Sequence, residues 1–506
     1  MTPGVHGERT RSRSFPRRCP AHLDASAWLG HATCMKRLSP GRALLVLLPA
    51  LSLVPLLCRC GGDDPAKPAT TGTGGTGGGA GGAGGAGSTS SGTAGGNPDG
   101  GVEVLPDLDP ALAWYGQNRQ RLDAFIDAHG RNDPGYDPAR RPVAVFDWDN
   151  TVIKNDVGDA TMFWMLRHDL IRQPAGKNWR LTSPYLTAAA RTALDVACGA
   201  LVDAGQPLPT STSSACADAI LSIYVDGTTT GGAAAFEGYN HRWISPGYAW
   251  LAQLQAGYLP AEIRSFADAA ITEALAADLG ATHTIGTRTG LAATLRIYDQ
   301  IRDLIGVMQE NGLDVWVVSA SPQFVVEPFA ERVGIAADHV VGIRQVTGGD
   351  GRLTANLQGC GSVPDGQNDG SGNVTGNALI TYIEGKRCWI NKVIYGDTGP
   401  NALTKTADPA KRQVFGAGDS DTDVTFLQDA TAMKLVVNRN KKEIMCNGYR
   451  NLGDRWLVNP MFIAPRPRYD AGYACATNAC VDASGAGAPC LDEEGQVIPE
   501  QVDSVY

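Results

Sequence analysis

Two carboxylates stand two residues apart at the end of a predicted buried strand. The apolar run 143–146 is continuous, which is typical of a strand covered on both faces, and Asp147 and Asp149 follow it directly. Neighbouring carboxylates can do nucleophilic and acid–base chemistry when their environments keep them in different protonation states. The sequence therefore places a candidate reactive pair at this strand end.

Further polar residues follow two other predicted strands. Ser319 comes after the apolar run 315–318, and Asp419 and Asp423 come after the short run 414–415. Reactive groups of parallel α/β sheets lie beyond the carboxyl ends of the strands, so we expect these side chains to meet the first pair. Carboxylates with water and phosphate oxygens suit Mg²⁺.

Helices and strands alternate around these residues. The pattern predicts a helix over 110–129, a helix over 297–308 that ends at Gly312, and a helix that opens at Pro322. Short apolar runs at 340–341 and 435–437 predict two more strands, the second being the last of the core. This order indicates an α/β fold with a parallel sheet and right-handed crossovers.

Four segments in chain order carry a family resemblance. They resemble the four motifs of the haloacid dehalogenase superfamily, which implies a Rossmann-like core with a largely helical cap domain inserted after the first strand. Ordinary turn-forming residues would not reproduce the whole set. The segments are Asp147-Trp148-Asp149-Asn150-Thr151, Val317-Val318-Ser319-Ala320-Ser321, Gly385-Lys386 and Gly418-Asp419-Ser420-Asp421-Thr422-Asp423.

The resemblance implies catalytic roles for four residues. Asp147 would attack phosphorus and form an aspartyl-phosphate, and Asp149 would protonate the leaving oxygen and then activate water. Ser319 would donate a hydrogen bond to a phosphoryl oxygen, and Lys386 would neutralise charge on the phosphate and on Asp147. Lys392 is the alternative to Lys386.

The resemblance also implies a magnesium site and further substrate contacts. Mg²⁺ would be held by Asp147, the backbone carbonyl of Asp149 and Asp419, while Asp423 would orient a metal-bound water. Thr151 would support the loop beside the substrate, and Asp421 would lie further from the ion.

A narrower resemblance concerns the leaving group. Several segments resemble the phosphorylcholine phosphatase branch, which implies an exported phosphomonoesterase acting on phosphorylcholine or related small alcohols. A trimethylammonium group is held by aromatic faces, and Trp148 is the first candidate because it lies between the two aspartates. The segments are Asp156, Arg242-Trp243, Tyr248-Ala249-Trp250, 315–322 and 437–442, and the cap aromatics are Phe163, Trp164, Tyr239, Trp243, Tyr248 and Trp250.

The N-terminal part of the chain has the pattern of a targeting signal. A positive segment after Met35 precedes the apolar run 43–57 and then Cys58 and Cys60, a layout that resembles a bacterial lipoprotein signal. We expect a leader and signal peptide over 1–60, a glycine-rich flexible linker over 61–100 and a phosphatase domain over 101–506. Within that domain we expect a core at 101–155 and 290–465, a cap at about 156–289 and an irregular cysteine-containing tail at 466–506.

Composition and charge limit the kinds of partner that we expect this chain to bind. Residues 61–506 hold 34 basic and 50 acidic side chains, and an acidic body is a poor nucleic-acid binder. The run 43–57 is too short for a comfortable span, so we expect membrane contact only through an N-terminal lipid anchor. Eight of the twelve cysteines lie in the body without C-x-x-C zinc spacing, so we expect disulfides, with Cys198 and Cys216 a plausible pair.

These observations predict an exported, Mg²⁺-dependent phosphomonoesterase, periplasmic or at the outer membrane or cell surface, with a small phosphate ester as its substrate. One alternative is a broad-specificity acid or phosphoserine-type phosphatase. The other is a tethered binding protein of the same fold without turnover.

Overall fold

The structure is a computed structural model that describes residues 104–369 and 373–505. The predicted leader, its lipid-anchor cysteines and the predicted linker lie outside the described residues. No helix in the described part of the chain is both long and apolar enough to cross a membrane.

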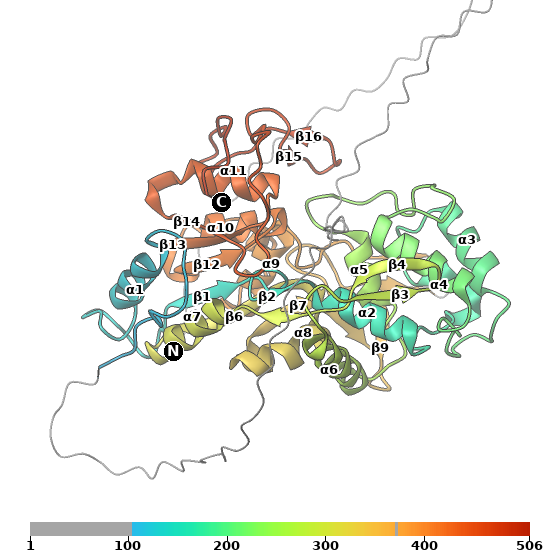
Figure 1. Cartoon of the computed structure of the whole chain (residues 1–506). Helices are drawn as coiled ribbons and strands as arrows, with labels where there is room; N and C mark the ends of the chain where they lie inside the picture. The colour runs from blue at the N-terminus through green and yellow to red at the C-terminus, as the bar shows by residue number, and fades with distance from the viewer. Residues whose placement is uncertain (1–103, 370–372, 506) are drawn as a thin grey trace, which may run out of the picture. The chain divides into compact units, whose positions relative to one another are not determined.

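A six-stranded, fully parallel sheet forms the core, as the strand–helix alternation predicts (Figure 1). The order is β14-β13-β12-β1-β6-β7, so the strand order reverses beside β1. Such a reversal opens a crevice at the carboxyl ends of the strands. The strands are β1 (Val143–Phe146), β6 (Asp314–Pro322), β7 (Val340–Ile343), β12 (Phe415–Gly418), β13 (Met433–Asn438) and β14 (Trp456–Pro460).

The prediction that 435–437 is the last core strand is wrong, because β14 follows it. Its run of three apolar residues ends in Asn459 and Pro460, which break the strand pattern. A proline is tolerated at a sheet edge, where β14 pairs only with β13. The predicted helix over 110–129 begins eight residues late, because Gly116 adopts a left-handed conformation (φ 56°) that interrupts it.

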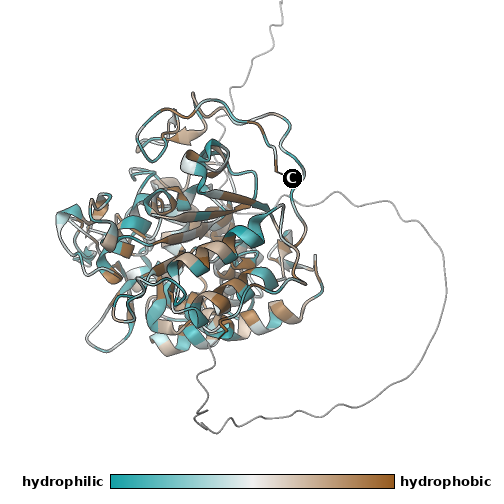
Figure 2. Cartoon of the chain, turned by 90° about the vertical axis from the view of Figure 1, so that its left-hand side faces the viewer, coloured by the Kyte–Doolittle hydropathy of each residue, from teal (hydrophilic) through white to brown (hydrophobic). Residues whose placement is uncertain are grey.

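Helices cover both faces of the sheet. Alternate residues of β1 enter different clusters, since Phe146 packs with α1, α7 and α8 whereas Val145 packs with α9, α10 and α11. Figure 2 shows mostly hydrophobic strands between helices that carry both hydrophobic and hydrophilic residues. The helices are α1 (Asn118–His129), α7 (Asp299–Glu310), α8 (Gln323–Ala330), α9 (Glu384–Val393), α10 (Val424–Asp429) and α11 (Lys442–Arg450).

A largely helical cap is inserted between β1 and β6, in agreement with the predicted fold class. The chain enters and leaves it through two short antiparallel strands, β2 (Ile153–Lys154) and β5 (Arg296–Ile297). The disulfide Cys198–Cys216 joins its helices α3 and α4. The cap elements are α2 (Val157–Arg167), α3 (Ala188–Cys198), α4 (Ser214–Leu221), α5 (Pro246–Gln253), α6 (Pro260–Ala276), β3 (Thr282–Ile285) and β4 (Arg288–Ala292).

Two further segments surround the core. The segment between β7 and α9 is tied to α9 by Cys360–Cys388. The tail is irregular, as predicted, and carries Cys446–Cys475 and Cys480–Cys490. The short strands here are β8 (Gln345–Thr347), β9 (Leu353–Leu357), β10 (Gln367–Asn368), β11 (Val374–Thr375), β15 (Cys480–Val481) and β16 (Gly487–Ala488).

Candidate active site

A tight turn places the first two aspartates. The carbonyl of Trp148 accepts hydrogen bonds from the backbone N–H groups of Thr151 and Val152, and Asn150 takes a left-handed conformation (φ 64°). Asparagine tolerates this conformation better than most residues, so the turn forms locally. The chain folds back at the end of β1, and the side chains of Asp147 and Asp149 both line one cavity.

Lys386 lies under Asp147. Its Nζ is 2.6 Å from Oδ1 of Asp147 and 2.6 Å from Oδ1 of Asp423, and it is fully buried at the start of α9. Burial alone would lower its pKa, but the two carboxylates hold that pKa above the ordinary value, so the ammonium stays charged. The alternative, Lys392, donates instead to the carbonyl of Gly359. The structure therefore brings Lys386 to the predicted nucleophile.

Three carboxylates form a candidate metal centre. Asp147, Asp419 and Asp423 are buried and each offers an oxygen within 4.8 Å of the others. Thr151 Oγ1 lies 2.9 Å from Oδ2 of Asp147 and 3.0 Å from Oδ1 of Asp419, so one hydroxyl proton serves two carboxylates. Burial and then Asp423 raise the pKa of Asp147 well above its usual range, although Lys386 lowers it.

This donor set fits a hard divalent cation. Oδ2 of Asp147 and Oδ1 of Asp419 converge on Thr151, and carboxylate oxygens are the ligands Mg²⁺ prefers. Oδ2 of Asp147 and Oδ1 of Asp419 accept from a neutral hydroxyl, whereas Oδ1 of Asp423 is paired with the Lys386 ammonium and its Oδ2 accepts from the backbone N–H groups of Asp419 and Ser420. Asp147 and Asp419 are therefore the better direct ligands, and Thr151 contacts carboxylates here.

Asp149 occupies a different environment. Oδ1 accepts from the backbone N–H of Val157 at 2.7 Å, and Oδ2 accepts from Ser321 Oγ at 2.8 Å and Ser319 Oγ at 3.3 Å. Burial and the nearby charge of Asp156 raise the pKa of Asp149 well above its usual range. A carboxyl group with a raised pKa can hold a proton and deliver it to a leaving oxygen.

The structure adds residues that the motif interpretation missed. Ser321 shares a strand face with Ser319, and this two-residue period could have identified it. Arg439 Nη1 lies 2.6 Å from Oδ2 of Asp419. Arg439 directly follows β13, so the strand-end argument that selected Asp147 could have selected it as well.

A cavity of about 590 Å³ opens above these groups. Its cap-side wall includes Asp156, Asp159 and Phe163 from the start of α2, with Tyr224 and Tyr248 nearby. The hydroxyl of Tyr224 donates to Oδ1 of Asp159 at 2.8 Å. The wall thus combines aromatic faces with two carboxylates.

The proposed role of Trp148 in substrate binding is wrong. Its side chain is fully buried against Phe329, with ring centroids 5.4 Å apart, and does not line the cavity. Neighbouring side chains of an extended segment point to opposite sides, so Trp148 faces the core because Asp147 and Asp149 face the cavity. Of the predicted cap aromatics, Phe163 and Tyr248 line the cavity, whereas Trp164, Tyr239, Trp243 and Trp250 do not.

Comparison with known proteins supports the fold. Residues 225–369 match the family model of the haloacid dehalogenase-like hydrolases. This region includes Ser319, whereas Asp147, Lys386 and Asp419 lie outside it. No curated protein matches the chain.

Solved structures resemble the chain at low identity. A conserved protein of unknown function from Anaerococcus prevotii is 19% identical with a TM-score of 0.50, covering 69% of this chain and 93% of its own. A protein of unknown function from Bordetella pertussis (16%, TM-score 0.35) covers 63% and 97%, and a substrate-bound phosphoserine phosphatase (12%, TM-score 0.25) covers 59% and 86%. At such identity, the first match supports the fold and not an activity.

Proposed function

We propose that this chain is a Mg²⁺-dependent phosphomonoesterase that works through a phosphorylated Asp147. The observation that carries this proposal is the contact of Asp147 with a buried, charged Lys386 beside a carboxylate cluster at the floor of a cavity. A charged ammonium at this position lowers the energy of negative charge that gathers on a transferring phosphoryl group.

The first half-reaction uses both aspartates. A carboxylate oxygen of Asp147 attacks phosphorus, the bond from phosphorus to the alcohol oxygen breaks, and Asp149 gives its proton to that oxygen. Ser319 and Ser321 donate to Asp149 and fix its orientation. When bound, Mg²⁺ would be held by Asp147 and Asp419 and would offset phosphoryl charge.

The second half-reaction returns the enzyme to its starting state. Asp149, now ionised, takes a proton from water as the water oxygen attacks phosphorus, and the bond between phosphorus and Asp147 breaks. Inorganic phosphate leaves, and Asp149 again carries its proton. One group can serve as acid and then as base because burial raises the pKa of Asp149 above the usual range of a carboxyl group, so that it can hold a proton, give it up and take one up again.

We propose an ester of a small cationic alcohol, of the phosphorylcholine type, as the substrate. Asp159, Tyr224 and Tyr248 on the cavity wall offer negative charge and aromatic faces, a combination that attracts an alkylammonium group. Burial, and then the charge of Asp159, raise the pKa of Tyr224 well above its usual range, so its ring stays neutral. A phosphoserine-type activity is the second candidate, because a serine ester also carries an ammonium.

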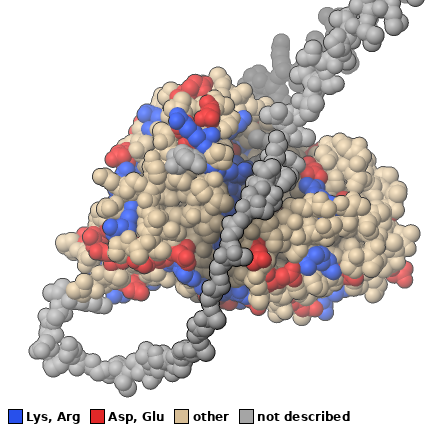
Figure 3. All heavy atoms as spheres, viewed as in Figure 1, with Lys and Arg blue, Asp and Glu red and all other residues tan. Residues whose placement is uncertain are grey.

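We also propose that the enzyme works after export and tethering. The N-terminal signal pattern motivates this, and the pairing of all eight body cysteines supports an oxidising compartment. On the face in Figure 3, acidic and basic side chains are intermixed.

A substrate panel tests this proposal. Phosphate release is measured from phosphorylcholine, phosphoethanolamine, phosphoserine, glycerol phosphate and an aryl phosphate, with Mg²⁺ and with chelator. We expect metal-dependent release, highest with phosphorylcholine, that Asp147→Asn abolishes. A folded wild-type protein that releases phosphate from none of them would favour the tethered binding protein instead.

A further inference from the structure

The N-terminus of α11 is capped from outside its own chain segment. Lys441 stands at the capping position and makes no capping hydrogen bond, because an ammonium group cannot accept one. Instead, Asp421 Oδ1 accepts from the backbone N–H of Glu443 at 2.8 Å and of Ile444 at 3.1 Å. One carboxylate therefore satisfies two of the four N–H groups that a helix start leaves open.

The capping residue belongs to the loop that carries the metal-site carboxylates. Asp421 lies between Asp419 and Asp423, but it is not a member of their cluster. A second link joins the same two loops, because Arg439, just before α11, contacts Asp419. The loop after β12 is thus fastened to the segment after β13 at two points.

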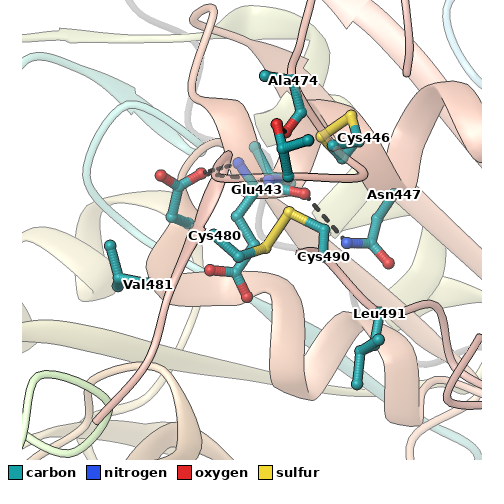
Figure 4. Close-up of a disulfide and its surroundings, with 12 residues drawn as sticks. Glu443, Cys446, Asn447, Ala474, Cys480, Val481, Cys490 and Leu491 are labelled. Atoms are coloured by element: carbon teal, nitrogen blue, oxygen red, sulfur yellow. Dashed lines mark hydrogen bonds between the residues drawn. A yellow bond between two sulfur atoms is a disulfide. The ribbon is translucent and has the colours of Figure 1, made fainter. Parts of the chain in front are cut away.

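Helix α11, whose start Asp421 caps, is itself held in place by other contacts. Glu443 is buried and pairs through both oxygens with Arg242, at 3.0 and 2.8 Å. Cys446 joins α11 to the tail through Cys475. Figure 4 shows the Cys480–Cys490 disulfide beside Glu443 and Cys446. Because α11 is fixed by this ion pair and by its disulfide to the tail, it gives the loop after β12 a rigid support.

We propose that Asp421 is a positioning residue for the divalent-cation site: by capping α11 it holds Asp419 and Asp423 in the geometry that binds the ion. This inference rests on the proposed metal-dependent function. The role requires an acceptor oxygen and not a negative charge, because the acceptor satisfies the backbone N–H groups. We therefore expect an asparagine at position 421 to cap α11 and position the loop as the aspartate does.

Cation binding to the full chain tests this role without turnover. Titration calorimetry with Mg²⁺ alone is compared for wild type, Asp421→Ala and Asp421→Asn. We expect the dissociation constant to rise about tenfold in Asp421→Ala and less than threefold in Asp421→Asn. Hydrogen exchange should speed up at Glu443 and Ile444 only in the alanine variant. Thr187→Ala, which removes the cap of α3, is the matched control and should leave Mg²⁺ binding unchanged.

A double variant separates the effect of the link between Asp421 and α11 from the effect of the stability of the helix start. Lys441→Ser gives α11 a capping hydroxyl of its own. Asp421→Ala with Lys441→Ser should regain slow exchange at Glu443 and still bind Mg²⁺ weakly relative to Lys441→Ser alone. This variant also covers the case in which Asp421→Ala fails to fold.

The outcomes separate the two proposals. Wild-type affinity in Asp421→Ala, or equal losses in the alanine and asparagine variants, would overturn the positioning role and leave the phosphatase intact. Asp419→Asn, which removes a proposed ligand, should abolish binding. Equal binding by Asp419→Asn and wild type, or none by either, would overturn the metal site and the positioning role together.

Discussion

Asp147 and Asp149 are chemically identical, and their surroundings give them different tasks. Asp147 contacts a charged ammonium, whereas Asp149 contacts two hydroxyl groups, one backbone N–H and the field of Asp156. Burial and a neighbouring carboxylate raise the pKa of both groups, and at Asp147 the Lys386 ammonium opposes this rise. The cation beside Asp147 suits the nucleophile, and the raised pKa of Asp149 suits the acid. The assignment of roles therefore depends on the partners of each carboxylate.

Asp149→Asn tests the acid role. An asparagine keeps the shape but delivers no proton to the leaving oxygen, so we expect kcat with phosphorylcholine to fall by about 10² to 10⁴. An aryl phosphate leaves as a weakly basic oxyanion and needs little protonation, so its first step should fall far less. Burst kinetics with both esters measure this difference, and equal losses in the burst rate would contradict the acid role.

Asp159→Asn tests the cationic leaving group. Asparagine can still accept from Tyr224, so the change removes charge and keeps the hydrogen bond. We expect kcat/KM for phosphorylcholine to fall about tenfold, a loss of about 1.4 kcal/mol, while that for glycerol phosphate changes less than threefold. A parallel fall for both esters would show that Asp159 does not select the ammonium group.

At the scale of elements, two disulfides of comparable loop length lie in different places. Cys446–Cys475 closes a separation of 29 residues on α11, and Cys198–Cys216 closes 18 residues in the cap. Loop-closure entropy gives each a similar contribution, about 3 to 4 kcal/mol. Only the first holds a helix that contacts the metal loop.

Paired substitutions test this difference. Cys446→Ala with Cys475→Ala should lower the Tm and raise the Mg²⁺ concentration for half-maximal activity several-fold. Cys198→Ala with Cys216→Ala should lower the Tm similarly and leave the Mg²⁺ requirement unchanged. An identical Mg²⁺ requirement in both pairs would show that α11 does not support the metal loop.

Strand β13 carries a buried lysine that makes stability depend on pH. Burial lowers the pKa of Lys434 from 10.5 to about 8, although Glu493 of the tail, 3.0 Å away, favours its charge. Between these values the unfolded chain keeps a proton that the folded chain has lost, so this residue's contribution to the unfolding free energy rises with pH.

Lys434→Met removes this dependence. Glu493 also pairs with Arg455, at 2.7 Å, so we expect it to keep a cationic partner in the variant. The unfolding free energy of wild type minus that of the variant should therefore rise between pH 8 and 10.5, by on the order of 3 kcal/mol. Denaturant unfolding at several pH values measures it, and a constant difference would contradict the lowered pKa.

Across the whole molecule, the sequence located the candidate site residues because apolar runs mark where the strands end. Asp147, Ser319 and Asp419 each follow an apolar run, and parallel strands bring such positions to one edge. The direction of each side chain was harder to predict, as Trp148 shows, because it depends on which neighbours face the cavity. β14 was missed because only its pairing with β13 makes its short run a strand.

The supports of the site depend on tertiary contacts. Arg242 reaches Glu443 across about 200 residues of sequence, and Asp421 reaches α11 across the whole of β13. No local pattern of propensity or spacing encodes such pairs, so sequence reasoning named the candidate residues of the site and left out most of the contacts that hold them in place.

A direct search for the phosphorylated enzyme tests the central claim. The full chain is mixed with phosphorylcholine and Mg²⁺, and the reaction is quenched in acid within the first turnover. The protein is then digested, and the mass and fragments of the peptide that contains residues 143–154 are measured by mass spectrometry. The account predicts one phosphoryl group on Asp147, present in wild type, absent in Asp147→Asn and absent with chelator. Release of phosphate by wild type without any phosphorylated Asp147, or undiminished release by Asp147→Asn, would contradict it.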